Sequence, residues 1–287
     1  MWFPRLASDR SLRARPVDAP FALTLKAQNA ERIHCLNPQA ERLGLSRGMT
    51  YADARAFCPD LVSRPADPVA DERFLHILRR WATRYCPGVG LEGADGLVLD
   101  ITGSAHLSGD EAGMLADMRQ RLVGAGFSVG LGLADTRGAA WALARYGEGV
   151  APPGDMLDAI GPLPVAALRL DDKTGVALQR LGLRRVSDLA AAARAPLARR
   201  FGPELLTRLD QALGDQPEEI APLSDPPHYG VRMAFPEPIG LSDDVMAGTS
   251  RLLDRLCDKL KAQEVGARVL CLTLRRVDQG SHQVELR

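Results

Sequence analysis

The segment Glu92-Gly-Ala-Asp-Gly-Leu-Val-Leu-Asp-Ile-Thr-Gly103 is the most informative stretch of this chain. Its first half is an acidic turn broken by glycines, and its second half is a short apolar run, Leu97–Ile101, that contains Asp100. Five such residues bounded by turn-forming residues predict a buried strand. Because the tip of a hairpin holds a carboxylate rigidly, Asp95 and Asp100 are the first candidates for a divalent metal site.

The two carboxylates are not expected to share an ion. Asp95 and Asp100 lie five residues apart, an odd spacing that directs their side chains to opposite faces of a strand. Asp95 sits in Gly93-Ala-Asp-Gly96, which has the composition of a solvated turn. Asp100 lies within an apolar strand and needs a polar partner, and we expect a hydrogen bond or ion pair there rather than a metal.

Composition bounds the class of protein. A chain of 287 residues is expected to form two or more compact units. The hydrophobic share of 46% and the charged share of 25% are ordinary for a globular protein. The formal net charge is zero, so any argument for nucleic-acid binding must be local. The basic residues are nearly all arginines, whose planar side chains bind phosphate in a fork-like geometry.

The five cysteines are scattered and have no metal-ligand spacing, so we expect buried free thiols in a reducing cytosol. No apolar run approaches the roughly 20 residues that span a bilayer. The start of the chain also lacks the pattern of a signal peptide. These observations predict a cytoplasmic location.

Strand-like and helix-like segments alternate over the first 150 residues. The apolar segment Met1–Leu6 is interpreted as the end of a strand, and residues 7–20 as loop-like or weakly helical. Strands are predicted at Phe21–Lys26, Arg32–Leu36, Val89–Glu92, Leu97–Ile101 and Phe127–Leu133, and helices at Pro38–Leu43, Thr50–Cys58, Asp71–Tyr85, Asp110–Leu122 and Thr136–Tyr146. The order strand, helix, two strands, helix, strand is the split βαβ pattern of a ferredoxin-like sheet, with residues 7–66 as an insertion.

The second half begins with a stretch rich in proline and glycine, residues 152–164, which predicts a boundary. Short helices joined by glycine turns are typical of helix-hairpin-helix units, and they are predicted at Asp171–Gln179, Ser187–Ala192, Pro196–Phe201 and Pro203–Leu213. A linker, Asp215–Pro227, follows. The last part is predicted as strand, helix, strand, strand, at Gly230–Phe235, Asp243–Gln263, Arg268–Arg276 and Gln283–Arg287.

Three motifs carry a family resemblance. The segment Gly93-Ala-Asp-Gly-Leu-Val-Leu-Asp-Ile-Thr102 resembles S-x-D-E-A-Y-L-D-x-T. Asn37-Pro-Gln-Ala-Glu-Arg-Leu-Gly44 with Gly48-Met49 resembles N-Y-E-A-R-x-x-G-x-x-x-G-M, and Ala134-Asp-Thr-Arg-Gly-Ala-Ala-Trp-Ala142 resembles A-P-N-K-x-x-A-K-x. These are motifs of the Y-family of translesion DNA polymerases. More closely, the chain resembles the ImuB-type branch, the polymerase-like component of a bacterial damage-induced mutasome.

The resemblance covers almost the whole chain and implies an α+β, multidomain right hand. The implied parts are a ferredoxin-like palm, small fingers, a helix-hairpin-helix thumb and a partial little finger, at residues 1–11 with 67–150, 12–66, 151–222 and 228–287, respectively.

The motifs depart from the family pattern where metal ions would be held. Phosphoryl transfer by two metals needs ions about 3.5–4 Å apart, held by several carboxylates. Met1-Trp-Phe-Pro4 occupies the end of the opening strand, where the first carboxylate belongs, and Asp9 lies too late to replace it. Asp95 matches one ligand, but Gly96 replaces the catalytic glutamate. The resemblance therefore implies a vestigial Asp95 and no complete metal site.

The triphosphate contacts of the family are replaced as well. Pro38 and Glu41 stand where the finger helix of the family has a tyrosine and an arginine. Proline has no hydroxyl group, and a glutamate repels a triphosphate. Trp141 replaces the palm lysine that reaches the same phosphates, although core packing is the simplest role for this tryptophan. We therefore expect no catalytic residue and no cofactor, and Mg²⁺ only if the chain proves to be an active polymerase.

Two groups of arginines are the candidates for DNA binding. The thumb group lies at the predicted hairpin turns and consists of Arg180, Arg184, Arg185, Arg199 and Arg200. The little-finger group lies on predicted strands and consists of Arg232, Arg268 and Arg276. Arginines beside turn amides contact phosphates well, although a solvated helix face is the other explanation. The first hairpin, Leu168-Arg-Leu-Asp-Asp172, lacks the glycines that the family has there.

The leading hypothesis is a catalytically inactive Y-family homologue that acts as a DNA-binding scaffold in damage-induced translesion synthesis and SOS mutagenesis. By resemblance, its partners are primer-template or damaged DNA, the β sliding clamp, a RecA-like accessory protein and an error-prone C-family polymerase. No clamp-binding motif is found, since Gln216-Pro-Glu-Glu-Ile220 is too acidic, so the chain is interpreted as part of a longer protein. The alternatives are an active Mg²⁺-dependent lesion-bypass polymerase and a protein-interaction module without DNA binding.

Overall fold

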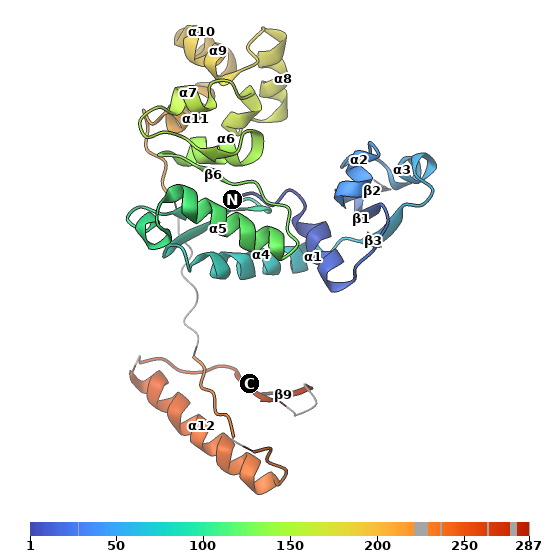
Figure 1. The fold of residues 1–287 in the computed structure, drawn as a ribbon, viewed down its shortest axis with the longest axis vertical. Coiled ribbons are helices and arrows are strands. Elements are labelled where there is room, and N and C mark those ends of the chain that lie inside the picture. Colours follow the sequence, from blue (N-terminus) through green and yellow to red (C-terminus); the bar gives the residue numbers. More distant parts are fainter. Residues whose placement is uncertain (28, 221–228, 236, 263, 276–279, 287) are drawn as a thin grey trace. The chain divides into compact units, whose positions relative to one another are not determined.

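The computed structural model describes residues 1–27, 29–220, 229–235, 237–262, 264–275 and 280–286. The chain divides into two compact units, Met1–Leu223 and Ser224–Arg287. Helices and short strands are interspersed over residues 6–150, residues 156–213 form helices, and the described part of the second unit has one helix followed by two strands (Figure 1). No helix in the described ranges is both long and apolar enough to span a membrane.

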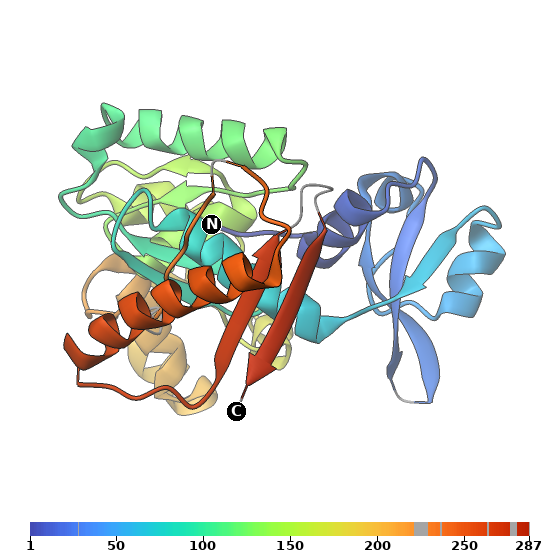
Figure 2. The same cartoon turned by 90° about the horizontal axis from the view of Figure 1, so that it is seen from below.

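A small sheet forms one lobe of the first unit (Figure 2). Strands β1 (Phe21–Ala27) and β2 (Ala30–Leu36) make the predicted antiparallel hairpin, and the turn residue Asn29 has a φ of 58°. The helices α2 (Pro38–Arg42) and α3 (Tyr51–Phe57) follow, as expected. Their N-caps, Asn37 and Thr50, accept hydrogen bonds from the Ala40 and Asp53 backbone amides, respectively.

Two features of this region differ from the prediction. Strand β3 (Val62–Pro65) was not predicted and pairs in parallel with β1, because a four-residue strand ending in proline gives little periodicity. The arginine-rich segment after the opening residues, predicted as loop-like or weakly helical, contains a regular helix, α1 (Leu6–Ala14). The first turn of α1 is buried, with Leu6 and Ala7 packed inward. Tertiary packing therefore stabilises this helix, which the charged sequence indicated only weakly.

The central part of the first unit is built on the Glu92–Gly103 segment. Its helices and strands are α4 (Pro68–Ala82), β4 (Gly88–Glu92), β5 (Gly96–Asp100), the 3-10 helix η1 (Ala105–Ser108), α5 (Glu111–Gly124), β6 (Gly132–Leu133), α6 (Arg137–Tyr146) and β7 (Gly149–Val150). β4 and β5 form an antiparallel hairpin with Glu92 opposite Gly96. A core of Phe3, Leu75, Leu78, Val89 and Leu97 joins the opening segment, α4 and the hairpin.

The opening segment lies between the hairpin and residue 130. Trp2 forms antiparallel bridges to both Gly96 and Gly130. The expected strand Phe127–Leu133 is shorter than predicted, because only Gly132–Leu133 forms a strand and Gly130 makes a single bridge.

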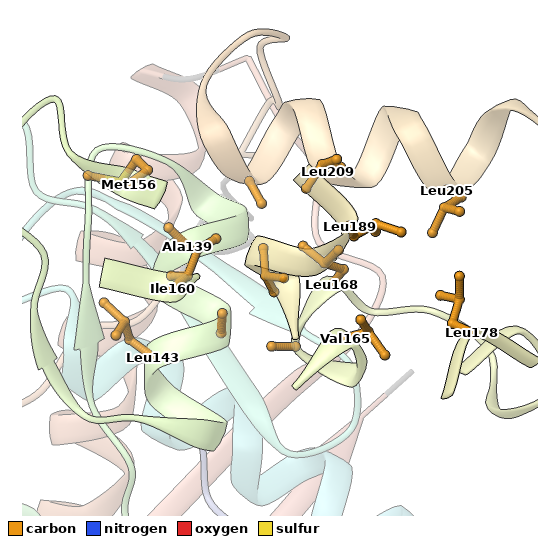
Figure 3. Close-up of a cluster of buried hydrophobic side chains, with 14 of the residues drawn as sticks. Ala139, Leu143, Met156, Ile160, Val165, Leu168, Leu178, Leu189, Leu205 and Leu209 are labelled. Atoms are coloured by element: carbon orange, nitrogen blue, oxygen red, sulfur yellow. The ribbon is translucent and has the colours of Figure 1, made fainter. Parts of the chain in front are cut away.

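The expected boundary at residues 152–164 contains a helix, α7 (Met156–Ile160), followed by η2 (Val165–Leu168). Met156 and Ile160 are buried in one continuous core with α6 (Figure 3). The other helices around this core are α8 (Asp172–Arg180), α9 (Val186–Ala191), α10 (Arg194–Phe201) and α11 (Pro203–Leu213). Gly138 permits the close contact between α6 and α11, since a Cβ there would lie 2.8 Å from the Ala212 Cα.

The second unit contains α12 (Ser242–Ala262) and an antiparallel pair, β8 (Leu270–Arg275) and β9 (Ser281–Leu286). The strand predicted at Gly230–Phe235 is wrong, because this segment has no strand pairing among the described residues. Its carbonyl groups are bound by α12 side chains instead. The Arg255 Nη1 donates to the Arg232 oxygen over 3.3 Å, and the Lys259 Nζ donates to the Gly230 oxygen over 3.1 Å.

Candidate functional site

Backbone hydrogen bonds fix the opening segment beside the Glu92–Gly103 hairpin. The Phe3 amide donates to the Asp95 oxygen over 2.8 Å, and the Leu97 amide donates to the Met1 oxygen over 3.0 Å. On the other side, Trp2 and Gly130 exchange two hydrogen bonds of 2.9 and 2.8 Å. The Trp2 side chain is thereby held next to Asp95.

Both carboxylate oxygens of Asp95 are engaged by protein groups. The Trp2 indole Nε1 donates to Oδ2 over 2.9 Å, and the Arg145 Nη2 donates to Oδ1 over 2.9 Å. The Asp95 side chain is 30% exposed and that of Arg145 only 16%, so this ion pair is partly shielded from water. Asp95 is therefore not the free, solvated turn residue that the sequence indicated.

Two tryptophans enclose the Arg145 guanidinium. Its Cζ lies 5.0 Å from the centre of the Trp2 ring and 4.6 Å from the centre of the Trp141 ring. Trp141 and Arg145 lie four residues apart on α6, a spacing that places both on one helix face. Trp141 is thus half-buried beside an arginine rather than part of the apolar core.

Gly96 is required by the close packing of the hairpin. A Cβ at this position would lie 2.7 Å from the Glu92 backbone oxygen and 3.2 Å from the Met1 oxygen. Any larger residue must therefore displace backbone. A glutamate at position 96 does not fit this arrangement.

The residues around Asp95 do not fit a divalent metal ion. No group of three or more Asp, Glu, His or Cys side chains in the described part of the chain could hold one. The adjoining cavity of about 90 Å³ is lined mostly by apolar side chains. Its acidic member, Glu92, is paired with Arg137 through hydrogen bonds of 2.9 and 2.7 Å. Since Mg²⁺ needs several oxygen ligands, Asp95 alone is insufficient.

The other acidic candidates serve structural roles. Asp100 is exposed at the end of β5 and accepts a 3.1 Å hydrogen bond from the Thr102 amide, as expected for a residue with a hydrogen-bonded role. The Thr102 hydrogen bonds lower the pKa of Asp100. Asp9 is buried on α1 and accepts a 2.7 Å hydrogen bond from the Ser128 amide. Burial raises the pKa of Asp9 despite this bond.

On the finger side, Glu41 forms an ion pair with Arg5. The Arg5 Nε donates to the Glu41 Oε2 over 2.8 Å, and Nη2 contacts the same oxygen. The Arg5 Nη1 also donates to the Ser128 hydroxyl over 3.0 Å. Glu41 therefore joins α2 to the central part of the unit. Pro38 is the exposed first residue of α2 and starts that helix.

A second set of contacts strengthens this junction. The Ser8 hydroxyl donates to the Leu36 oxygen over 2.7 Å, and the Arg47 Nη2 contacts the Pro4 oxygen. Together with the Arg5–Glu41 pair, these contacts join the lobe formed by β1–β3, α2 and α3 to the opening segment and α1.

A third charge cluster surrounds Glu218, which lies in the predicted linker. Arg169 binds Glu218 through two hydrogen bonds of 2.7 and 2.6 Å, while Arg137 and Arg208 lie 3.7 and 3.6 Å from its Oε1. Burial alone would raise the pKa of Glu218, but the Arg169 hydrogen bonds and the neighbouring cations outweigh it and lower the pKa. Arg169 belongs to the first thumb hairpin, so that turn holds the linker.

The structure sorts the thumb arginines into paired and free groups. Arg194 binds the buried Asp210 through bonds of 2.8 and 2.6 Å, and Arg208 faces Glu218. Those that are exposed and have no ion pair among the described residues are Arg180, Arg184, Arg185, Arg199 and Arg200. They flank two turns at Gly182 and Gly202, whose φ values are 82° and 81°.

The little-finger candidates are less well placed. Arg232 and Arg268 are exposed, but neither lies on a strand. Arg276 lies outside the described residues. The structure therefore does not place Arg232 and Arg268 on a strand surface, which corrects the prediction for these two arginines.

Sequence reasoning missed three residues of these clusters: Arg145, Arg5 and Glu218. Arg145 had a weak sequence signal, because it follows Trp141 by four residues on a predicted helix. Arg5 and Glu218 had none, since their partners lie 36 and 49 residues away.

Comparison with known proteins gives three findings. Residues 6–145 match the impB/mucB/samB family. Over 238 residues the chain is 44% identical to Protein ImuB of Caulobacter vibrioides (strain NA1000 / CB15N). This alignment covers 82% of this chain and 52% of that protein. It is 22% identical to DNA polymerase IV of Dehalococcoides mccartyi (strain CBDB1) over 94% of this chain and 71% of that protein.

The fold resembles the crystal structure of DinB from Sulfolobus solfataricus, with a TM-score of 0.65, 17% identity, and coverage of 100% of this chain and 86% of that one. The chain spans about half the length of the ImuB proteins that it matches.

Proposed function

Since residues 6–145 carry the domain of the impB/mucB/samB family and the fold is that of Y-family DNA polymerases, we propose that this chain is a catalytically inactive polymerase homologue. It acts as a DNA-binding scaffold in damage-induced translesion synthesis. The observation that carries the proposal is the pairing of Asp95 with Trp2 and Arg145, which replaces a metal-binding carboxylate group by a closed ion pair.

The replacement extends to the nucleotide contacts. Glu41 is neutralised by Arg5, and Trp141 covers the Arg145 guanidinium instead of supplying a cation for a triphosphate. Because each of these groups has a partner within the chain, none is left to bind metal or triphosphate. This supports a chain that contributes binding rather than phosphoryl transfer.

DNA binding is proposed for the thumb turns. The five free arginines, Arg180, Arg184, Arg185, Arg199 and Arg200, are exposed beside helix ends, where their guanidinium groups can contact a phosphate backbone. The contact at the α8–α9 turn relies on side chains, because the Arg184 and Arg185 amides donate to Asp188. The first hairpin does not take part, because Arg169 is bound to Glu218 and Asp171 caps α8. By the likeness to ImuB, we also propose a sliding clamp, a RecA-like protein and an error-prone C-family polymerase as partners.

Two assays test this function. In the first, primer extension on damaged templates with Mg²⁺ is expected to show no nucleotide incorporation above background. Incorporation that Asp95→Ala abolishes would overturn the inactive assignment in favour of an active polymerase.

The second assay measures binding of a fluorescent primer-template at low salt. We expect binding by the native chain and its loss when Arg184, Arg185, Arg199 and Arg200 are changed to Glu. Charge changes at Arg119 and Arg121, which form ion pairs on α5, serve as the control and should have little effect. Undetectable binding by the native chain would favour a protein-interaction module instead.

A further inference from the structure

One cationic group is enclosed by two indoles and a carboxylate. The Arg145 guanidinium lies between the rings of Trp2 and Trp141, and its Nη2 binds Asp95. These contacts come from three segments far apart in the sequence: the opening residues, the β4–β5 hairpin and α6. The Arg145 Nε is buried and has no hydrogen-bond partner, so ring faces rather than hydrogen bonds hold that end of the group.

We propose that Trp2, Trp141 and Asp95 form a cage for a planar guanidinium ion, and that Arg145 is the resident occupant. A guanidinium group is flat and weakly hydrated, so it stacks on aromatic faces at little cost in desolvation. A divalent ion retains its waters and needs several oxygen ligands, but the cage supplies one carboxylate and two apolar walls. The cage therefore selects a planar organic cation over a metal ion.

The walls are positioned independently of the occupant. Backbone hydrogen bonds on both sides hold Trp2, and its Nε1 donates to Asp95. Trp141 is carried by α6, whose buried face packs Ala139, Ala142 and Leu143 into the core. Removing the Arg145 side chain should thus leave a vacant slot between two fixed rings. The inference does not depend on DNA binding or on the catalytic state of the chain.

Chemical rescue of Arg145→Ala tests the cage. We expect the variant to unfold at a lower temperature than the native chain, and 10–50 mM ethylguanidinium, roughly the range for a weak site, to raise its Tm by about 2 °C. The same salt should not raise the Tm of the native chain, whose cage is filled. Arg119→Ala removes an exposed arginine paired with Glu148 and is the matched control, for which no rescue is expected.

Other cations establish the selectivity. Ethylammonium has the same charge without the planar group, and Mn²⁺ tests a metal site. Neither is expected to stabilise Arg145→Ala, and the double variant Trp141→Leu/Arg145→Ala should lose the rescue by ethylguanidinium. Equal stabilisation by Mn²⁺, or rescue that survives the loss of Trp141, would overturn the proposal.

A conservative variant covers the case in which Arg145→Ala does not fold. Arg145→Lys keeps the positive charge but removes the flat stacking surface. We expect a lower Tm and altered tryptophan emission, measured with Trp81→Phe in the background so that only Trp2 and Trp141 report. A Tm and an emission spectrum identical to those of the Trp81→Phe chain that retains Arg145 would show that planarity is not required and would refute the cage.

Discussion

In the Arg5–Glu41 contact, α2 carries the acidic side chain and the opening segment carries the basic one. The motif that residues 37–49 resemble has an arginine at the position of Glu41, whereas in this chain Arg5 supplies the cation. The Glu41 carboxylate is stabilised here by its ion pair with Arg5, which also donates a hydrogen bond to Ser128. A glutamate that would repel a triphosphate is thus a structural residue that joins two parts of the first unit.

The Arg5–Glu41 pair should make a measurable contribution to stability. Its side chains are 24% and 35% exposed, so solvent screens it partly and we expect a coupling of about 1 kcal/mol between Arg5→Met and Glu41→Gln. A double-mutant cycle with urea unfolding measures this coupling. The more exposed Arg119–Glu148 pair, at 42% and 53%, is the control and should give close to zero. Equal couplings for the two pairs would contradict the structural role of Glu41.

Cysteine reactivity should follow burial. Cys35, Cys58 and Cys86 are buried, whereas Cys257 and Cys271 are exposed, which corrects the expectation that all five are buried. Burial also raises the pKa of the Cys86 thiol to about 11, so little thiolate forms at neutral pH. A thiol reagent at pH 8 is expected to modify Cys257 and Cys271 quickly and the others only after unfolding. Mass spectrometry of the modified peptides checks the sites.

At the scale of elements, the start of the linker is attached to the rest of the first unit. Glu218 brings together Arg137 of α6, Arg169 after η2 and Arg208 of α11. The Arg137 Nη1 also donates to the Glu219 oxygen over 2.9 Å. One carboxylate therefore attaches residue 218 of the linker to three parts of the first unit.

Glu218→Gln should destabilise the first unit. Three cations would lose their shared carboxylate, and a loss of about 1–3 kcal/mol is expected in urea unfolding. Glu219→Gln is the matched control, because within the described residues Glu219 makes a contact through its backbone oxygen alone. A loss below 0.5 kcal/mol, roughly the size of an ordinary surface change, would refute the anchoring role.

The Glu218 contribution should also depend on pH. Its pKa is lower in the folded chain than in the unfolded chain, so the folded state is stabilised above the unfolded pKa. The stabilisation is lost as the pH falls through the lowered folded value. The difference in unfolding free energy between the native chain and Glu218→Gln is therefore expected to be constant near neutral pH and to shrink below about pH 4. A difference that grows on acidification would contradict this assignment.

For the whole molecule, net charge gives no reason to expect DNA binding, since the chain is formally neutral. Ion pairs within the fold determine which arginines of the thumb region remain unpaired. Arg169, Arg194 and Arg208 are neutralised by Glu218 and Asp210, and the five free thumb arginines remain at two turns. Among the described residues, the unpaired arginines of this region are thus the five that the sequence indicated, and they lie at two turns.

The salt dependence of DNA binding measures how many of these arginines contact phosphate. Each phosphate contact with duplex DNA lowers the slope of log K against log salt by about 0.9. Arg184→Gln with Arg185→Gln is expected to reduce the magnitude of the slope by one to two contacts, roughly 1–2 units. Unchanged slopes would show that the α8–α9 turn does not contact DNA.

The sequence by itself predicted the fold and most of the elements of this protein. The Glu92–Gly103 segment identified the hairpin, and Thr50 as an N-cap located its helix, because these patterns are local. The sequence also showed that Gly96, Glu41 and Trp141 depart from the family pattern. Elements stabilised by tertiary packing, such as α1 and β3, were missed or weakly indicated.

Only the tertiary structure decided what the departing residues do. Trp2, Asp95 and Arg145 lie up to 143 positions apart, and no local pattern shows that they meet around one guanidinium. Glu41 and Glu218 likewise find their arginines across 36 and 49 residues. Ion pairs and ring contacts depend on distances that the chain sets only when it folds, so the sequence showed which residues depart from the motifs but not the contacts that these residues make.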